Sequence, residues 1–220
     1  MKRTVSTILW IALAAQASWV ILNGLVLHRT PGFDALGAVI LVSLTAFAAL
    51  HSRPGWGWLA VVVRTLMAAD FLLAVADRFG LLGAPGAPGV VSGDFSHFID
   101  YTRSIASFAP GSSAPTLAVL ATIAEVTLAT ALLLGVRLRL TALATALLLA
   151  TYGTSMMISL PAAEQFHYNV FLLAAGMLML STIGRSPLTL DAVLNRQRRP
   201  GAASQADREA LADAATGIVK

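Results

Sequence analysis

LAVLATIAEVTLATALLLGV (residues 117–136) is the first of three apolar runs in the second half of the chain. RLR (137–139) links it to LTALATALLLATYGTSMMISL (140–160), and VFLLAAGMLMLSTIG (170–184) follows after a short polar link. Each run is near the roughly 20 residues that a helix needs to cross about 30 Å of hydrocarbon. RLR is too short to be anything but the turn of a helical hairpin. This stretch therefore predicts transmembrane helices, with one acid, Glu125, inside the first of them.

The composition agrees with a membrane protein. Hydrophobic residues make up 57% of the chain and charged residues 12%, with a mean hydropathy of +0.76. An ordinary soluble domain has about 45–50% apolar and about 25% charged residues. The chain contains no cysteine, which excludes disulfides, thiolate metal sites and Cys-ligated iron–sulfur clusters. The basic residues flank apolar runs, so topology explains the positive net charge and we expect no nucleic-acid partner.

The first half of the chain adds three more apolar runs, at residues 5–27, 35–50 and 58–76. The first begins like a signal peptide, with Ala15-Gln16-Ala17 as an A-x-A cleavage site. Because its apolar character continues to Leu27, we expect an uncleaved helix. Whether residues 1–17 are removed stays open. The second run is short. We predict an all-α polytopic protein of six spans.

A long polar segment separates the third span from the fourth. GAPGAPG (83–89) cannot form regular structure. Phe95, Phe98, Thr102 and Ile105 then recur at helical spacing, which predicts a short amphipathic helix. The helix lies on the membrane surface, or it packs over the mouth of the bundle. We expect the segment 79–115 to face outward.

The charges of the loops predict the orientation. With six spans, eleven of the fifteen Lys and Arg residues fall on the side of the two termini, and three fall on the opposite side. Arg64 lies within a span. By the positive-inside rule the termini are cytoplasmic, in a plasma membrane of the bacterial (inner) type. Residues 192–220 read as a polar, basic cytoplasmic tail.

Three segments resemble the DoxX-like family of small integral membrane proteins. They are VVVRTLMAADFLLAVADRFGLLG (61–83), AEVTLATALLLGVRLRLTALATALLLA (124–150) and SPLTLD (186–191). The resemblance implies a four-helix core over residues 56–191, with residues 1–55 as two additional N-terminal helices outside the match. Members of this family are associated with quinone-linked oxidation and with membrane oxidoreductase assemblies. The resemblance therefore implies a membrane subunit of a redox system, with a quinone as cofactor and a membrane or soluble redox partner.

Ionisable residues inside spans are functional candidates by default. Glu125 is the strongest candidate, either as a protonatable group facing a cavity or as half of a buried pair with Arg64 or Arg78. In the predicted topology several polar side chains could line an outward-facing pocket with donors for a quinone head group. The candidate intramembrane site comprises Glu125, Arg64, Asp70, Asp77, Arg78, Tyr152 and His167. The alternative is a belt of amphipathic side chains at the interface.

Two other functions remain open. In one, the chain is a small proton-coupled transporter or channel in which Glu125 carries the proton. In the other, it is a structural scaffold in which every intramembrane charge is paired. Whether the chain is an enzyme stays undecided. We predict no metal site, because His167 and Glu164 alone do not make one. Gln16 and Asn23 share a helix face, which predicts hydrogen bonds between helices.

Overall fold

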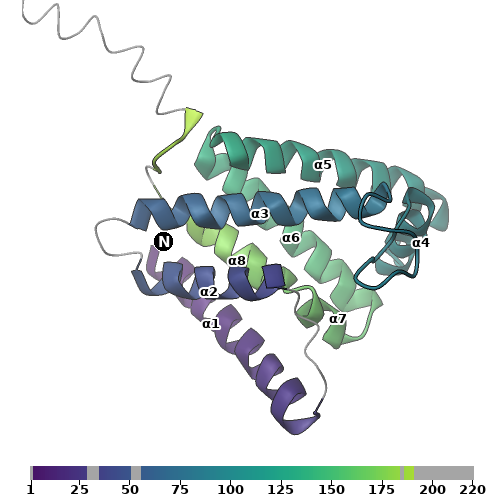
Figure 1. Ribbon diagram of the computed structural model, residues 1–220, viewed down its shortest axis with the longest axis horizontal. Helices are drawn as coiled ribbons and strands as arrows, with labels where there is room; N and C mark the ends of the chain where they lie inside the picture. Colours follow the sequence, from purple (N-terminus) through teal and green to yellow (C-terminus); the bar gives the residue numbers. More distant parts are fainter. Residues whose placement is uncertain (1, 29–34, 51–55, 184–185, 191–220) are drawn as a thin grey trace, which may run out of the picture.

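The computed structural model describes residues 2–28, 35–50, 56–183 and 186–190, except for the side chains of residues 35, 56 and 162. These residues form helices and connecting turns, and no strand occurs among them (Figure 1). The predicted all-α class is therefore confirmed. The loop residues Arg29 and Arg53 and the tail 192–220, used in the orientation argument, lie outside the described residues.

The helices follow the predicted runs closely. In chain order they are α1 Lys2–Ile21 with a π-helical turn η1 Leu22–Val26, α2 Ala35–Leu50, α3 Trp56–Arg78, α4 Phe95–Ile105, a 3₁₀ turn η2 Gly111–Ser113, α5 Ala114–Leu134, α6 Leu138–Ser159, α7 Ala162–His167 and α8 Val170–Leu180. Four stretches of the described chain are long and apolar enough to cross a membrane: Lys2–Val26, Gly57–Arg78, Gly111–Leu134 and Leu138–Ser159. These apolar helices indicate a membrane-embedded protein.

The last predicted run, 170–184, forms the 11-residue α8 Val170–Leu180, which ends four residues earlier than the run. The polar link before it contains a short helix, α7, that was not predicted. Asn169, at a φ of 55°, separates the two helices, because a left-handed residue cannot continue an α-helix. α2 is also shorter than the four long helices.

α8 is the centre of the molecule. Nearly all its side chains are buried, and it packs against α6, α1 and α3. A helix that is apolar all round must be covered on every side. α2 packs against α3, and one continuous core includes Leu9, Leu44, Met67 and Met177. The two N-terminal helices, outside the resemblance, therefore share the core of the rest of the chain.

The turn between α5 and α6 lies slightly before the predicted RLR turn. Gly135 ends α5 at a φ of 64°, and Arg137, at a φ of 40°, precedes the first residue of α6. Glycine adopts this left-handed conformation without a steric cost, which makes it a common helix terminator. The hairpin is thus confirmed, and its tight turn begins two residues before RLR. We call the end of the bundle that contains this turn the Gly135 end.

α4 covers the opposite end of the bundle, which we call the α4 end (Figure 1). Asp94 begins the helix by accepting a hydrogen bond from the backbone N–H of His97 at 2.8 Å. Phe98 and Thr102 are buried, and the helix packs against α5, α6 and α3. The amphipathic helix is therefore confirmed, and its contacts favour packing over the bundle. GAPGAPG forms turns without helix or strand, as predicted.

Candidate functional site

A buried ion pair joins α3 to α5. Arg78 Nη2 donates to Glu125 Oε1 at 2.9 Å and lies 2.7 Å from Oε2, which is an ionic contact without the alignment of a hydrogen bond. The side chains are 8% and 2% exposed. Arg78 is the last residue of α3, and Glu125 lies in the middle of α5. Of the two partners predicted for Glu125, the structure has Arg78.

Two hydroxyl groups extend the pair. Tyr152 on α6 donates its Oη–H to Glu125 Oε1 at 2.8 Å. Arg78 Nη1 donates to Thr122 Oγ1 at 3.1 Å, and the Thr122 hydroxyl donates to the carbonyl of Ala118. We call Arg78, Glu125, Thr122 and Tyr152 the Arg78–Glu125 network. It joins three helices, and these contacts give the carboxylate two donors besides the ionic contact.

α4 closes the network from outside. The guanidinium carbon of Arg78 lies 3.8 Å from the centroid of the Phe98 ring. A cation over an aromatic face is stabilised by the ring quadrupole, by about 2 kcal/mol or more where water is excluded. Phe98, on the buried side of the amphipathic helix, is thus the third partner of Arg78, after Glu125 and Thr122. This explains why Phe98 is buried.

Asp77, beside Arg78, serves the loop instead. Its Oδ1 accepts from the backbone N–H of Val91 at 3.1 Å, and its Oδ2 accepts from the N–H of Ser92 at 2.7 Å. Both carboxylate oxygens are therefore used to hold the segment that follows the GAPGAPG turns. Asp77 is buried but not part of the Arg78–Glu125 network.

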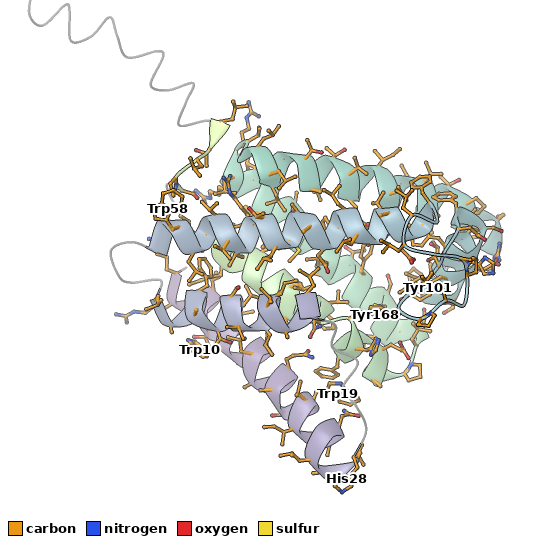
Figure 2. All side chains as sticks on the ribbon, in the orientation of Figure 1. Trp10, Trp19, His28, Trp58, Tyr101 and Tyr168 are labelled. Atoms are coloured by element: carbon orange, nitrogen blue, oxygen red, sulfur yellow. The ribbon has the colours of Figure 1, made fainter. Side chains whose placement is uncertain are left out.

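Aromatic side chains gather at the α4 end beside the network. The Tyr101 and Tyr168 rings lie 6.4 Å apart, and Figure 2 shows them where α4 approaches α7. Burial raises the pKa of Tyr101, and nearby Tyr168 and Glu164 raise it further while Arg78 opposes them. His167 is exposed and stands edge-on to Tyr168 at 5.1 Å. The predicted His167 therefore lies beside the network without joining it.

Arg64 and Asp70 are not near Glu125's partner. At 1.5 Å per residue, Asp70 is about 12 Å and Arg64 about 21 Å from Arg78 along α3. Arg64 Nη2 donates to the carbonyl of Leu188 at 2.6 Å, which lies at the Gly135 end. Asp70 is half-buried in the middle of α3. The structure therefore brings Arg78 and Tyr152 to Glu125, whereas Arg64 contacts Leu188 at the Gly135 end.

The predicted interhelical role of two amides is half right. Gln16 Nε2 donates to the carbonyl of Phe166 at 2.9 Å, where Trp19 also stacks on the Phe166 ring at 5.2 Å. Asn23 instead donates to the carbonyl of Trp19 in its own helix. Asn23 is buried in the π-helical turn that follows α1, where its amide is used within its own helix.

The sequence analysis missed Thr122 and Phe98 as members of the site. Thr122 lies three residues before Glu125, a spacing that places both on one helix face, so this contact could have been found. Phe98 comes from a separate segment, and no spacing relates it to Arg78.

A small apolar cavity between α2 and α3, lined by residues such as Leu44 and Met67, lies away from the network.

The geometry favours retention of charge inside the network over binding of a metal. Across the described ranges no group of three His, Asp or Glu side chains could hold a metal ion. The carboxylate of Glu125 and the guanidinium of Arg78 neutralise each other, and hydroxyls and a ring occupy their remaining directions.

Comparisons with protein-family models, with curated proteins and with solved structures found no match for this chain.

Proposed function

We propose that this chain is a multi-pass membrane subunit whose Arg78–Glu125 network locks the helices together. One observation carries the proposal: a buried ion pair that is also bonded to Tyr152 and covered by Phe98 joins α3, α5, α6 and α4. Charges inside a membrane bundle are costly unless they are paired. A buried pair held from several helices is suited to fixing how those helices meet, which is the scaffold role left open by the sequence.

The proposed topology has six crossings with cytoplasmic termini. Contacts at the two ends of the bundle support it. Arg64, near the start of α3, reaches Leu188, beyond α8, whereas Arg78, at the end of α3, reaches the other end. The short helices α2 and α8 would cross the membrane packed against the longer helices. The bacterial-type inner membrane follows from the loop charges, and the DoxX-like assignment from the three resembling segments.

A double-mutant cycle tests the lock. Glu125→Gln and Arg78→Gln each leave one buried charge without its partner, which typically costs about 3–5 kcal/mol. The double variant removes both charges, so we expect it to lose less stability than the sum of the single variants. Thermal unfolding in one detergent measures all four proteins. Additive losses would contradict the lock.

The exposed ion pair between Asp100 and Arg103 on α4 is the matched control. Its side chains are 66% and 50% exposed. Because exposed pairs contribute only about 0–1 kcal/mol, Asp100→Asn and Arg103→Gln should change the melting temperature little. A change as large as that of the buried pair would show that any charge deletion destabilises this protein in detergent.

A second candidate is contact with a quinone in a redox assembly. The observation that favours it is the set of donors and rings at the α4 end, namely Tyr152, Arg78, Tyr101, Tyr168 and exposed His167. A quinone carbonyl accepts hydrogen bonds from such groups. In this role a quinone head group would take the Tyr152 hydroxyl from Glu125, and a membrane or soluble protein would exchange electrons with it.

Proton-coupled transport fits the geometry less well. A proton on Glu125 would neutralise the partner of Arg78 and leave a buried cation uncompensated. Transport would therefore require the pair to open in each cycle. In proteoliposomes, substrate-driven proton movement that vanishes with Glu125→Gln would support the transporter and overturn the preference for the lock.

A further inference from the structure

Arg64 is a buried cation whose guanidinium makes one hydrogen bond within the described part of the chain. The residue is 2% exposed, and its Nη2 donates to the carbonyl of Leu188 at 2.6 Å. Its Nε and Nη1 are buried, and no described residue supplies either with a hydrogen-bond acceptor. The ion pairs found among the described residues do not include Arg64. Two donors and a full positive charge therefore call for a partner.

The guanidinium of Arg64 lies at the Gly135 end of the bundle. Its Nη1 is so close to Gly135 that a Cβ on that residue would overlap it. Helical side chains point toward the N-terminus of their helix, so Arg64 reaches from the first half of α3 toward this end. Trp58, 60% exposed, lies at the same end of α3 (Figure 2), and tryptophan is enriched where membrane helices meet lipid head groups. The guanidinium is thus placed near the head-group level.

The charges at this end favour an anion. Gly135 ends α5, and a helix C-terminus carries about half a negative charge, which offsets the guanidinium only in part. A buried charge is costly unless it is paired and hydrogen-bonded. Arg137 and Arg139, at the α5–α6 turn, are exposed and add positive charge at the same end. An oxyanion would supply both the missing charge and the missing acceptors.

A short segment after α8, residues 186–190, covers Arg64, and we call it the strap. Pro187 lies against Gly57 at the start of α3, where an added Cβ would be 3.0 Å from Pro187 Cδ. Leu188 is 65% exposed and adopts a φ of 55°, which non-glycine residues rarely adopt. This unfavourable conformation directs the Leu188 carbonyl to Arg64. The strap therefore provides one neutral acceptor where an oxyanion would provide several charged ones.

We propose that Arg64 binds the phosphate of a phospholipid head group, which displaces the strap and takes the place of the Leu188 carbonyl. Such a phosphate accepts from Nη2 and from the neighbouring Nη1 or Nε in the bidentate geometry that guanidinium groups favour. Basic groups between membrane helices are suited to lipid head groups, and Arg137 and Arg139 attract the same charge. The site lies at the opposite end from the Arg78–Glu125 network and does not depend on the lock. The other source of the same chemistry is free inorganic phosphate.

Thermal unfolding of delipidated protein in a maltoside detergent without phosphate tests the site. Phosphatidylglycerol should raise the melting temperature of wild type by several degrees, because a ligand of the folded state stabilises it. Arg64→Met removes the guanidinium and should show no such rise. The control Arg103→Gln removes an exposed arginine at the α4 end and should respond like wild type.

Two results of this experiment would overturn the proposal, namely no rise in wild type and equal rises in wild type and Arg64→Met. Inorganic phosphate is tested in parallel and should have no effect at the same concentration. If it reproduces the rise in wild type but not in Arg64→Met, the site binds free phosphate and the lipid is the wrong source.

Thiol labelling tests the same site with Arg64 intact, which covers the case that Arg64→Met does not fold. The chain has no cysteine, so Ser186→Cys introduces a single thiol at a buried position of the strap. Because the head group displaces the strap, phosphatidylglycerol should accelerate the reaction with a maleimide several-fold. Ser96→Cys, exposed on α4, is the control and should react at one rate with and without lipid. Labelling of Ser186→Cys that lipid does not accelerate would contradict the displacement and overturn the proposal.

Discussion

Among the side chains of the network, removal of the Tyr152 hydroxyl should reduce the stability of the protein less than removal of either charge. Tyr152→Phe keeps the ring but removes the hydroxyl that donates to Glu125 Oε1. Hydrogen bonds to charged groups contribute about 1.5–3 kcal/mol, less than the loss of an ion-pair partner in a buried site. We expect thermal unfolding to show a smaller loss than for Glu125→Gln. A loss as large as that variant's would mean that Tyr152 does more than donate to the carboxylate.

Asp94 predicts a pH dependence in α4. The hydrogen bond from the His97 backbone N–H lowers the pKa of Asp94, and the His97 side chain adds to this. Because the folded-state pKa lies below the ordinary value, the cap stabilises α4 above the ordinary pKa and is lost as pH falls through the lowered one. The NMR shift of the His97 amide should report this transition. It should vanish in Asp94→Ala and persist in Asp100→Asn.

At the scale of single residues, the sequence identified Glu125 and its possible partners, but it did not show which partner Glu125 contacts. Hydropathy made Glu125 stand out, and Arg78 was one of its two expected partners. Arg64 was the other. The sequence of α3 does not show which of its two arginines lies opposite Glu125 on α5. That choice depends on how far α3 and α5 are offset, which packing sets. The role of Asp77 in the loop could not be predicted for a similar reason, because the backbone amides of Val91 and Ser92 that it accepts from have no sequence signature.

The α5–α6 turn should be sensitive to any side chain at Gly135. Gly135→Ala places a Cβ against Arg64 and Thr189 at a left-handed φ of 64°. The left-handed conformation alone costs a non-glycine residue roughly 1–2 kcal/mol. The steric overlap of the added Cβ with Arg64 and Thr189 increases this cost. Gly86→Ala is the matched control, because Gly86 has a φ of 83° but open space around its Cβ position. Gly135→Ala should lower the melting temperature more than Gly86→Ala. Equal losses would argue against close packing of Arg64 on the turn.

Whole helices were the most predictable feature. The boundaries of α2 match the predicted run, and those of α3, α5 and α6 differ by about two residues, because long apolar runs between charged turns leave few alternatives. The length and the environment of the helix in the run 170–184 were harder to predict. Composition alone does not distinguish a lipid-facing span from a central helix such as α8, which has 11 residues and is almost entirely buried. The left-handed Asn169 also has no unique sequence signal.

The orientation of the whole molecule can be tested with introduced cysteines. Ser96, on α4, and Arg139, after the α5–α6 turn, are both exposed and lie at opposite ends of the bundle. In intact bacterial cells, a membrane-impermeant maleimide should label Ser96→Cys but not Arg139→Cys. Both should react once the cells are permeabilised. The reverse pattern would contradict cytoplasmic termini, and labelling of both in intact cells would contradict the proposed crossings.

The scaffold proposal also belongs to the scale of the whole molecule. The Arg78–Glu125 network and the Phe98 ring that covers it join four helices at the α4 end, and one continuous core joins the N-terminal helices to the rest. The sequence predicted that intramembrane charges would matter. It could not predict that Arg78 and Glu125 would pair with each other, because the two partners come from different helices. That pairing distinguishes a lock from an open ligand site.

The most direct test is a thermal-shift comparison of wild type and Glu125→Gln in detergent, with and without a soluble quinone analogue. A ligand that binds only the folded state raises the melting temperature. If the network is a lock, the analogue should leave the wild type unchanged, and Glu125→Gln should unfold at a lower temperature in both conditions. A shift in wild type that disappears in Glu125→Gln would contradict the lock and establish a quinone site at the network.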